Sequence, residues 1–165
     1  MKNNKNFKTA DLCDLHSDNL IIMHQQFKSY GKKHSFCGKI STIKCFNDNS
    51  KVREAVNTDG CNKVLVIDGN ASMECALLGD MLAEAAYKNN WSGIIVYGCI
   101  RDSDVIADID IGVFALSTKP VKSVKKGIGD TDINVNFFDV EFKPGNFIYA
   151  DQDGIIISET ELELN

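Results

Sequence analysis

Two short apolar runs separated by a helical stripe constrain the fold of this chain more than any other feature. Lys63–Ile67 is nearly all apolar and ends at Asp68-Gly69, which is typical of a strand buried on both faces. Ile94–Tyr97 is a second run of this kind. Between them, Met81–Asn90 carries apolar residues at positions 81, 82, 85 and 86, which predicts an amphipathic helix. The order predicts a β/α/β unit with parallel strands and a right-handed crossover.

The remaining segments predict further strands, hairpins and short helices around this unit. We expect antiparallel strands over 133–142 and 147–150, joined by a turn at 143–146. A turn at 151–154 leads into a strand at Ile155–Ser158, and the acidic tail 159–165 is expected to be frayed. The other expected elements are a helix at Thr9–Asp14 with Thr9 as N-cap, a strand at Phe36–Phe46, a helix at Ser50–Asn57 and a strand at Gly112–Leu116.

Length and charge limit the class of protein. A chain of 165 residues with 44% hydrophobic residues predicts a single domain, 1–165, of the α/β class with mixed parallel and antiparallel sheets. The net charge of −5 argues against direct binding of nucleic acid, because phosphate contacts need clustered Lys and Arg. Four lysines between Lys119 and Lys126 are interpreted as a local solvated edge. No apolar run is long enough for a membrane span or a signal core, so a cytoplasmic protein is expected.

The cysteines and histidines do not form a metal-binding pattern. Six cysteines occur without a C-x-x-C pair, and we expect reduced, mostly buried thiols. The three histidines, at positions 16, 24 and 34, all lie near the start of the chain, so a His-rich zinc site is not expected.

Asp80 and the pair Arg101-Asp102 are the candidate site residues. Asp80 stands at the expected start of the helix, after Gly79, and Arg101-Asp102 directly follows the second strand. In a β/α/β unit the helix N-terminus lies at the same edge as the carboxyl ends of the strands, where open α/β sheets bind ligands. The spacing therefore predicts that these residues meet at one sheet edge. Gly79 would let another group approach the backbone there.

These residue types match a site for an anion and a divalent metal. The N–H groups of Gly79, Asp80, Met81 and Leu82 would face an anion at the helix N-terminus, and Arg101 could clamp a carboxylate. Asp102 could bind Mg²⁺ or Mn²⁺, with Asp80 holding a metal-bound water. Such a site polarises a keto group and stabilises the enolate left when a C–C bond breaks.

Simpler interpretations of the same residues stay open. Asp80 alone is more often a helix cap, and Arg101-Asp102 alone is more often a surface turn with local ion pairs. Asp68-Gly69 and Asp153-Gly154 are interpreted as turns. Only the joint spacing favours a functional site.

Several segments together resemble the family named after the regulator of ribonuclease activity A. Those that carry the resemblance include Thr9–Asp14, Lys44–Asn49, Val66–Gly69, Trp91–Gly98, Asp110–Gly112, Gly127–Gly129, Val135–Phe137 and Tyr149–Asp151. The resemblance implies a swivelling β/β/α fold in a ring-shaped homotrimer with sites between subunits.

The family resembled has two functional branches. Some members are metal-dependent class II aldolases that cleave 4-hydroxy-4-methyl-2-oxoglutarate to pyruvate products and decarboxylate oxaloacetate. Others bind and inhibit the endoribonuclease RNase E. In the aldolase branch, the segment matching Gly79–Leu82 binds the substrate carboxylate through backbone amides, the match of Arg101 binds substrate, and the match of Asp102 holds the metal.

The resemblance leaves two functional hypotheses. The regulator branch tends to lose the acids at the positions of Asp80 and Asp102, and this chain keeps both. Segments such as Lys44–Phe46 and Val135–Phe137 are nevertheless closer to the regulator branch. The first hypothesis is a divalent-metal lyase for a small 2-oxo dicarboxylate, and the second is a homotrimer that docks on RNase E or an RNA helicase. In longer aldolases a neighbouring subunit adds a C-terminal acid, for which this chain offers only Glu159, Glu161 or Glu163.

Overall fold

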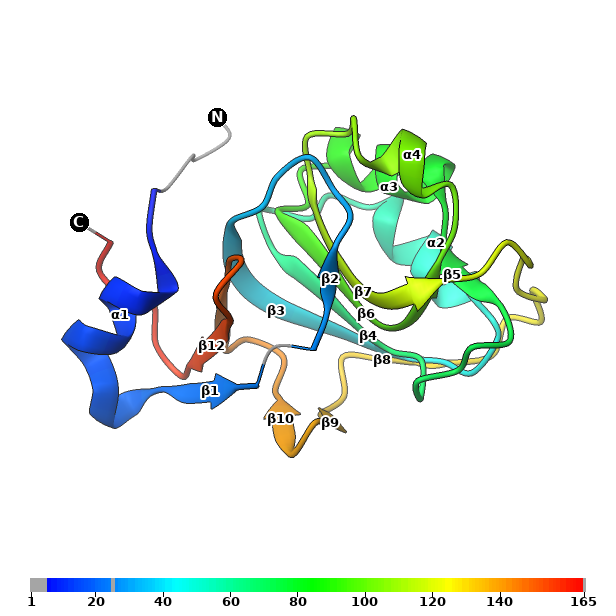
Figure 1. Ribbon diagram of the computed structural model, residues 1–165. Helices are drawn as coiled ribbons and strands as arrows, with labels where there is room; N and C mark the ends of the chain where they lie inside the picture. The colour runs from blue at the N-terminus through cyan, green and yellow to red at the C-terminus, as the bar shows by residue number, and fades with distance from the viewer. Residues whose placement is uncertain (1–5, 25, 165) are drawn as a thin grey trace.

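One mixed sheet of ten strands organises the computed structural model, which describes residues 6–24 and 26–164 (Figure 1). Its centre is four parallel strands in the order β3 (Phe36–Lys44), β4 (Val64–Asp68), β6 (Gly93–Ile100) and β7 (Gly112–Thr118). Antiparallel strands extend the sheet on both sides. The predicted α/β class with mixed sheets is confirmed.

The central strand β4 shows why the apolar runs were informative. All five of its residues are buried. Leu65 and Ile67 belong to the core on the helical face, whereas Val64 and Val66 belong to the core on the opposite face. β4 pairs in parallel with β6, so the predicted pairing of the two runs is confirmed. A continuous apolar run is needed here because both faces of the strand are covered.

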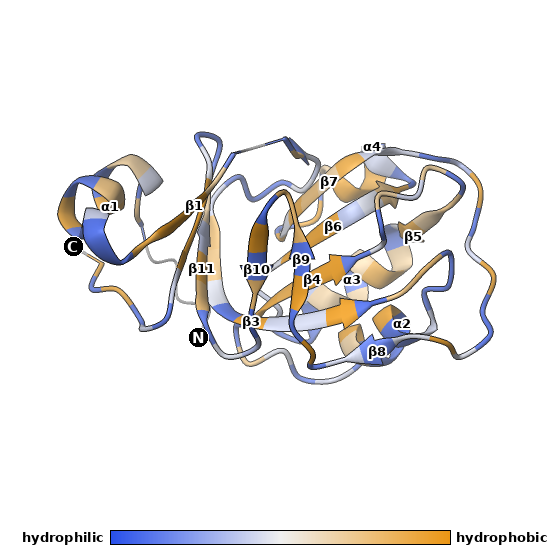
Figure 2. Ribbon diagram, turned by 90° about the horizontal axis from the view of Figure 1, so that it is seen from below, coloured by the Kyte–Doolittle hydropathy of each residue, from blue (hydrophilic) through white to orange (hydrophobic). Residues whose placement is uncertain are grey.

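Three helices cover one face of the sheet: α2 (Ser50–Val56), α3 (Asp80–Lys88) and α4 (Ser103–Ile106) (Figures 1 and 2). α3 buries Ala83 and Ala86 completely and carries the i,i+4 ion pair Glu84–Lys88 at 3.2 Å. The predicted stripe was wrong at Met81, which is 81% exposed. Met81 lies two residues before the buried Ala83, about 200° around the helix, and therefore faces away from the core.

A two-stranded hairpin covers the other face, as Figure 2 shows. It consists of β9 (Val135–Phe137) and β10 (Val140–Phe142), whose turn residues Phe138 and Asp139 both have positive φ. The prediction of one strand over 133–142 paired with 147–150 was wrong. The pairing differs because Phe137 stacks on Phe142 and on Tyr97 of β6, which folds the segment back on itself over the sheet.

β11 (Phe147–Ala150) joins the main sheet between β3 and β12 (Ile155–Ser158). The predicted turn into β12 is confirmed by the bond from the Asp151 N–H to the Gly154 carbonyl. Thr9 is not the N-cap of α1 (Thr9–His16), because Lys8 takes that place and the Thr9 hydroxyl donates to Asp151 Oδ1 at 2.7 Å. This bond fastens α1 to the β11–β12 hairpin.

The acidic tail is packed rather than frayed over the part that the structure describes. Leu162 is 8% exposed, and its N–H donates to the Tyr149 hydroxyl at 2.8 Å.

The expected burial of the cysteines holds for three of six, since Cys61 is exposed and Cys13 and Cys37 are partly exposed. Burial, together with the nearby acids Asp48 and Asp68, raises the pKa of the Cys45 thiol to about 12.

The remaining elements are η1 (Ser17–Asn19), β1 (Ile21–Met23), β2 (Lys28–Ser29), β5 (Ala76–Leu78) and β8 (Asp130–Thr131).

Within the described ranges, no helix combines the length and the apolar character needed to cross a membrane.

Candidate functional site

The structure brings Gly79, Arg101 and Asp102 together at the carboxyl edge of the parallel strands. β5 leads through Gly79 into α3, and β6 leads through Arg101-Asp102 into α4. The Arg101 N–H donates to the Leu78 carbonyl at 2.9 Å, which ties the two segments. A Cβ at Gly79 would lie 3.0 Å from Asp102 Oδ2 and 3.5 Å from Arg101 Cγ. Because Gly79 has an extended backbone, a side chain here would meet no unusual φ, and its one tight contact would be with the Asp102 carboxylate.

Asp102 is held in a left-handed conformation (φ 55°, ψ 41°) at the start of α4. Its backbone carbonyl accepts the Ile106 N–H at 3.0 Å. Its carboxylate lies 3.6 Å from Arg101 Nε, and both side chains are 42% exposed. A pair so exposed contributes little to stability, and the carboxylate stays accessible to a ligand.

Asp80 is the first residue of α3, and its carboxylate accepts the N–H of Met81 at 2.8 Å. One of the four amides proposed to hold a ligand, Met81, is therefore already engaged. The N–H groups in the first turn of a helix have no partner within the helix, and those of Asp80 and Leu82 belong to residues that line the cavity described next. The N-cap of α3 is Gly79, with no side-chain cap bond, so Asp80 is not the helix cap and lies in the first turn at the site.

These residues line an open cavity of about 680 Å³. Gly79 to Leu82 and Arg101 form one side, and the irregular segment 121–125 forms another. Asp102 does not line this cavity, but its carboxylate lies next to Gly79, which does. The charged lining residues are four cations and one acid: Arg53, Arg101, Lys122, Lys125 and Asp80.

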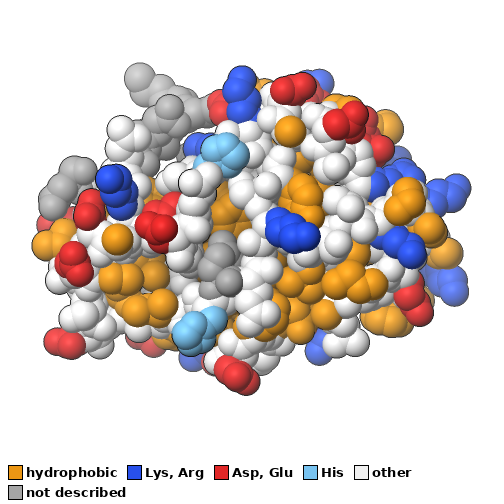
Figure 3. All heavy atoms as spheres, in the orientation of Figure 1, with side chains coloured by type: hydrophobic (Ala, Val, Ile, Leu, Met, Phe, Trp, Pro, Cys, Tyr) orange, Lys and Arg blue, Asp and Glu red, His pale blue; other side chains and the backbone are white. Residues whose placement is uncertain are grey.

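The positive lining contrasts with the net charge of −5 of the whole chain. The segment that follows β7 lies at the right-hand end of the molecule in Figure 1, and Lys and Arg side chains gather at the same end in Figure 3. The four lysines interpreted from sequence as a solvated edge therefore include two that line the cavity, Lys122 and Lys125. Such local charge attracts an anionic ligand irrespective of the total.

Asn49 is a site residue that the sequence did not reveal. It lines the cavity, is 9% exposed, and donates through Nδ2 to the Leu77 carbonyl at 3.3 Å. Its Oδ1 is buried and has no hydrogen-bond partner among residues 6–24 and 26–164. Buried polar atoms are seldom left unsatisfied, so this oxygen is a candidate acceptor for a ligand donor. The sequence feature that could have pointed to Asn49 is the polar run Asn47-Asp48-Asn49, which follows the strand expected at Phe36–Phe46.

The residues present fit a Mg²⁺-type site rather than a closed metal cage. Over the described part of the chain, no group of three or more His, Cys, Asp or Glu side chains could hold a metal ion. Mg²⁺ is commonly bound through one or two carboxylates, with waters and substrate completing the shell, and Asp102 offers one such carboxylate. Glu161, one of the C-terminal acids considered, lines a different cavity of its own chain.

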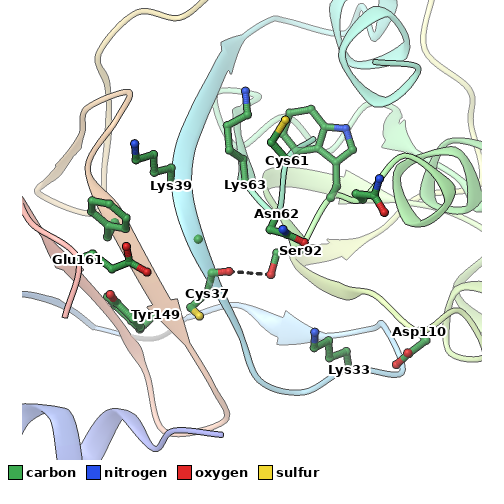
Figure 4. Close-up of a pocket in the computed structure, with 14 residues that line it drawn as sticks. Lys33, Cys37, Lys39, Cys61, Asn62, Lys63, Ser92, Asp110, Tyr149 and Glu161 are labelled. Atoms are coloured by element: carbon green, nitrogen blue, oxygen red, sulfur yellow. Dashed lines mark hydrogen bonds between the residues drawn. The ribbon is translucent and has the colours of Figure 1, made fainter. Parts of the chain in front are cut away.

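That second cavity, of about 410 Å³, lies at the amino ends of the parallel strands (Figure 4). It contains Lys33, Lys39 and Lys63 but not Gly79–Leu82, Arg101 or Asp102. Lys63 lies over the Trp91 ring at 5.7 Å and Lys39 over the Phe147 ring at 5.6 Å, so two of its three lysines already have cation–π partners. The carboxyl edge is the better candidate for a catalytic site.

Comparisons with known proteins agree on the relationship but not on one activity. A family model described as RraA-like, Aldolase/RraA, matches residues 9–157. A curated relative from Aromatoleum aromaticum, named "Putative 4-hydroxy-4-methyl-2-oxoglutarate aldolase", is 55% identical and covers 94% of this chain and 98% of its own. A relative of the same name from Pseudomonas aeruginosa is 53% identical over 96% of this chain and 98% of its own.

Two solved structures superpose closely on this fold. The RNA-processing inhibitor RraA from Thermus thermophilis has a TM-score of 0.92 at 35% identity and covers 96% of both chains. A Geobacillus kaustophilus protein named S-adenosylmethionine:2-dimethylmenaquinone methyltransferase also has a TM-score of 0.92, at 46% identity, over 94% of this chain and 97% of its own. The names of these relatives and solved structures imply three different activities, so the function has to be argued from the residues of the site.

Proposed function

This chain belongs to the RraA-like family, and from that premise we propose that it is a cytoplasmic lyase that cleaves 4-hydroxy-4-methyl-2-oxoglutarate to pyruvate and decarboxylates oxaloacetate. One observation carries the proposal. A helix N-terminus, Arg101 and two lysines line the same cavity, in a protein that is acidic overall. This arrangement suits a substrate with two carboxylates.

The two ends of the substrate would bind to different walls. The carboxylate beside the 2-keto group would accept hydrogen bonds from the first-turn amides of α3 and from Arg101, which can clamp it in bidentate fashion. The distal carboxylate would then face Lys122 and Lys125 on the opposite wall. Asn49 Oδ1, the unsatisfied acceptor, is suited to a hydroxyl donor such as the 4-hydroxyl of the substrate.

Asp102 is the residue that would hold a divalent cation, Mg²⁺ or Mn²⁺. When bound, the cation would supply Lewis-acid polarisation of the keto group. Arg101, next to Asp102, would stabilise the negative charge that develops as the C3–C4 bond breaks.

Asp80 is the titratable group available for the proton steps. Cleavage removes the proton of the 4-hydroxyl and breaks the C3–C4 bond, so that C4 becomes the keto carbon of one pyruvate. The other fragment leaves as a pyruvate enolate, which then takes up a proton at its methylene carbon. Asp80 lines the cavity and would orient a water molecule that exchanges these protons with the substrate.

Pyruvate release tests the proposal. The purified protein is incubated with 4-hydroxy-4-methyl-2-oxoglutarate or oxaloacetate, with Mg²⁺ and after EDTA treatment. We expect pyruvate from both substrates in Mg²⁺ and background rates in EDTA. Absence of pyruvate from both substrates with Mg²⁺ and with Mn²⁺ would refute the lyase proposal.

A second proposed function is regulation of RNA processing, and the 35% identity to the Thermus thermophilis inhibitor favours it. In this function the protein would act as a homotrimer that docks on RNase E or an RNA helicase. The exposed Met81 and Val124 beside the cavity are apolar surface suited to contact with a neighbouring subunit. Binding to immobilised RNase E that survives EDTA and the substitution Asp102→Ala would support this function, and no binding by the untreated protein would refute it.

A further inference from the structure

The wall of the cavity that carries Lys122 and Lys125 has almost no regular secondary structure. Residues 121–128, hereafter the lysine segment, form one isolated bridge, from Lys122 to Ala76, and no helix or strand. Its apolar side chains do not anchor it either, since Val121, Val124 and Ile128 are 50%, 60% and 64% exposed. Its position must therefore depend on specific hydrogen bonds.

Most of these bonds come from one short stretch, Asn47–Ser50, at the end of β3 and the start of α2. The Val124 N–H donates to the Asn47 carbonyl at 3.1 Å. The Ser123 hydroxyl accepts the Asn49 N–H at 3.2 Å, and the Ser50 hydroxyl accepts the Gly127 N–H at 3.0 Å. This stretch thus contacts the lysine segment at several successive points.

Asp48 is the centre of the arrangement. Its Oδ2 accepts the N–H groups of Lys126 at 2.8 Å and Ile128 at 3.1 Å. Its Oδ1 accepts the N–H of Ser50 at 2.8 Å and the Ser50 hydroxyl at 2.6 Å. The side chain is 4% exposed and does not line the cavity.

The charge of this carboxylate is well stabilised. Burial raises its pKa, but the hydrogen bonds from Ser50, Ile128 and Lys126 outweigh burial and hold the pKa well below the usual range for aspartate. A neutral amide at this position would place an NH₂ group against some of these N–H donors.

We infer that Asp48 is a positioning residue that holds the lysine segment as the wall for the distal carboxylate of the substrate, without touching the substrate. The inference rests on the proposed lyase function. It implies that, beyond the contact of Val121 and Lys122 with Ala76, different residues support the two halves of the site. The half at α3 and Arg101 is part of the β/α/β unit, whereas the lysine half depends on Asp48.

Asp48→Asn tests this inference through substrates that use different halves of the site. Exchange of pyruvate methyl protons with D₂O needs only the half at Arg101, and cleavage of 4-hydroxy-4-methyl-2-oxoglutarate needs both. We expect the KM for cleavage to rise about tenfold, with pyruvate exchange within about twofold of wild type. Asp68→Asn is the matched control, because Asp68 is also buried at this sheet edge but bonds Asn70 in its own turn. This control is expected to retain the wild-type KM.

A folded Asp48→Asn protein with unchanged KM would overturn the inference, as would an equal loss of pyruvate exchange and cleavage. If the variant does not fold, Ser50→Ala serves instead, since it removes the acceptor for Gly127 and a donor to Asp48.

Amide hydrogen exchange separates this inference from the lyase proposal. Asp48→Asn should speed exchange at residues 121–128 by about tenfold or more and leave α3 unchanged, whether or not the protein is a lyase. Faster exchange in a protein without lyase activity would refute only the proposed function. Unchanged exchange would refute the role of Asp48.

Discussion

The two edges of the parallel sheet both carry a cavity with several cations, but they use those cations differently. At the amino edge, Lys39 and Lys63 lie over aromatic rings of the protein itself. At the carboxyl edge, Arg101 lies next to one exposed carboxylate, at the end of a strand and beside a helix N-terminus. Charge alone therefore does not identify a catalytic site. The difference arises from strand direction, which brings helix N-termini to only one of the two edges.

The comparison predicts that metal removal is the largest perturbation and acts at the carboxyl edge alone. Treatment with EDTA should lower the rate of pyruvate release at least about a thousandfold, because polarisation of the keto group is lost. Added Mg²⁺ should restore the rate in wild type but not in Asp102→Ala. A rate that is insensitive to EDTA, or unchanged in Asp102→Ala, would contradict the role of Asp102.

Arg101→Ala should lower kcat/KM for cleavage by about 100- to 1000-fold, since the developing negative charge loses its nearest cation. Steady-state kinetics with saturating Mg²⁺ measures the effect. Lys63→Ala is the matched control, because it removes a cation from the cavity at the amino edge and should leave kcat/KM unchanged. Equal losses in both variants would abolish the distinction between the edges.

Gly79→Ala should lower kcat/KM by about tenfold, because the new Cβ would shift the Asp102 carboxylate by a few tenths of an ångström. Gly98→Ala is the control on β6, where the nearest atom to a new Cβ, Leu77 Cδ1, lies at an ordinary 3.5 Å. Near-wild-type kinetics in Gly79→Ala would mean that the close approach at this position has no importance for catalysis.

Asp48→Asn should reduce the free energy of unfolding by about 2 kcal/mol at neutral pH, through the loss of charge-assisted hydrogen bonds. The folded-state pKa of Asp48 is lowered, so its stabilisation is fully present above the unfolded pKa of about 4. The stabilisation is lost as the pH falls from there toward the folded pKa. Urea unfolding of wild type and variant at pH 7, 5 and 3 should therefore show a difference that shrinks only at the lowest pH. A difference that stays constant with pH would contradict this.

Lys125→Ala should have the smallest effect, a rise of about tenfold in KM for the dicarboxylate with little change in kcat. Lys39→Ala, at the amino edge, is its control and should not change KM. If the two lysine variants behave alike, the distal carboxylate does not bind to the lysine segment.

The part of the site that could be predicted from sequence is the part formed by regular structure. Arg101 and Gly79 come together because each follows a strand of the same β/α/β unit, and alternation and helical spacing reveal such a unit. β5 was missed because three apolar residues, Ala76–Leu78, are too few to distinguish a strand from a loop.

The lysine segment could not be predicted for a different reason. Asp48 and Ile128 are 80 residues apart in sequence, and their bond joins a side chain to a backbone amide in irregular structure. No periodic pattern encodes such a contact. The hairpin at 135–142 was misassigned for a related reason, since its pairing depends on contacts among Tyr97, Phe137 and Phe142 that are distant or non-periodic in sequence.

Trp91 is the only tryptophan of the chain, and it lines the cavity at the amino edge, with its indole N–H bonded to the Thr58 carbonyl. Fluorescence excited at the indole absorption band therefore reports on the amino edge of the sheet. Its intensity should change when the sheet unfolds and stay nearly constant when substrate binds at the carboxyl edge. A tryptophan introduced at the exposed position of Met81 would place a second chromophore at the proposed site, so each edge could be observed separately.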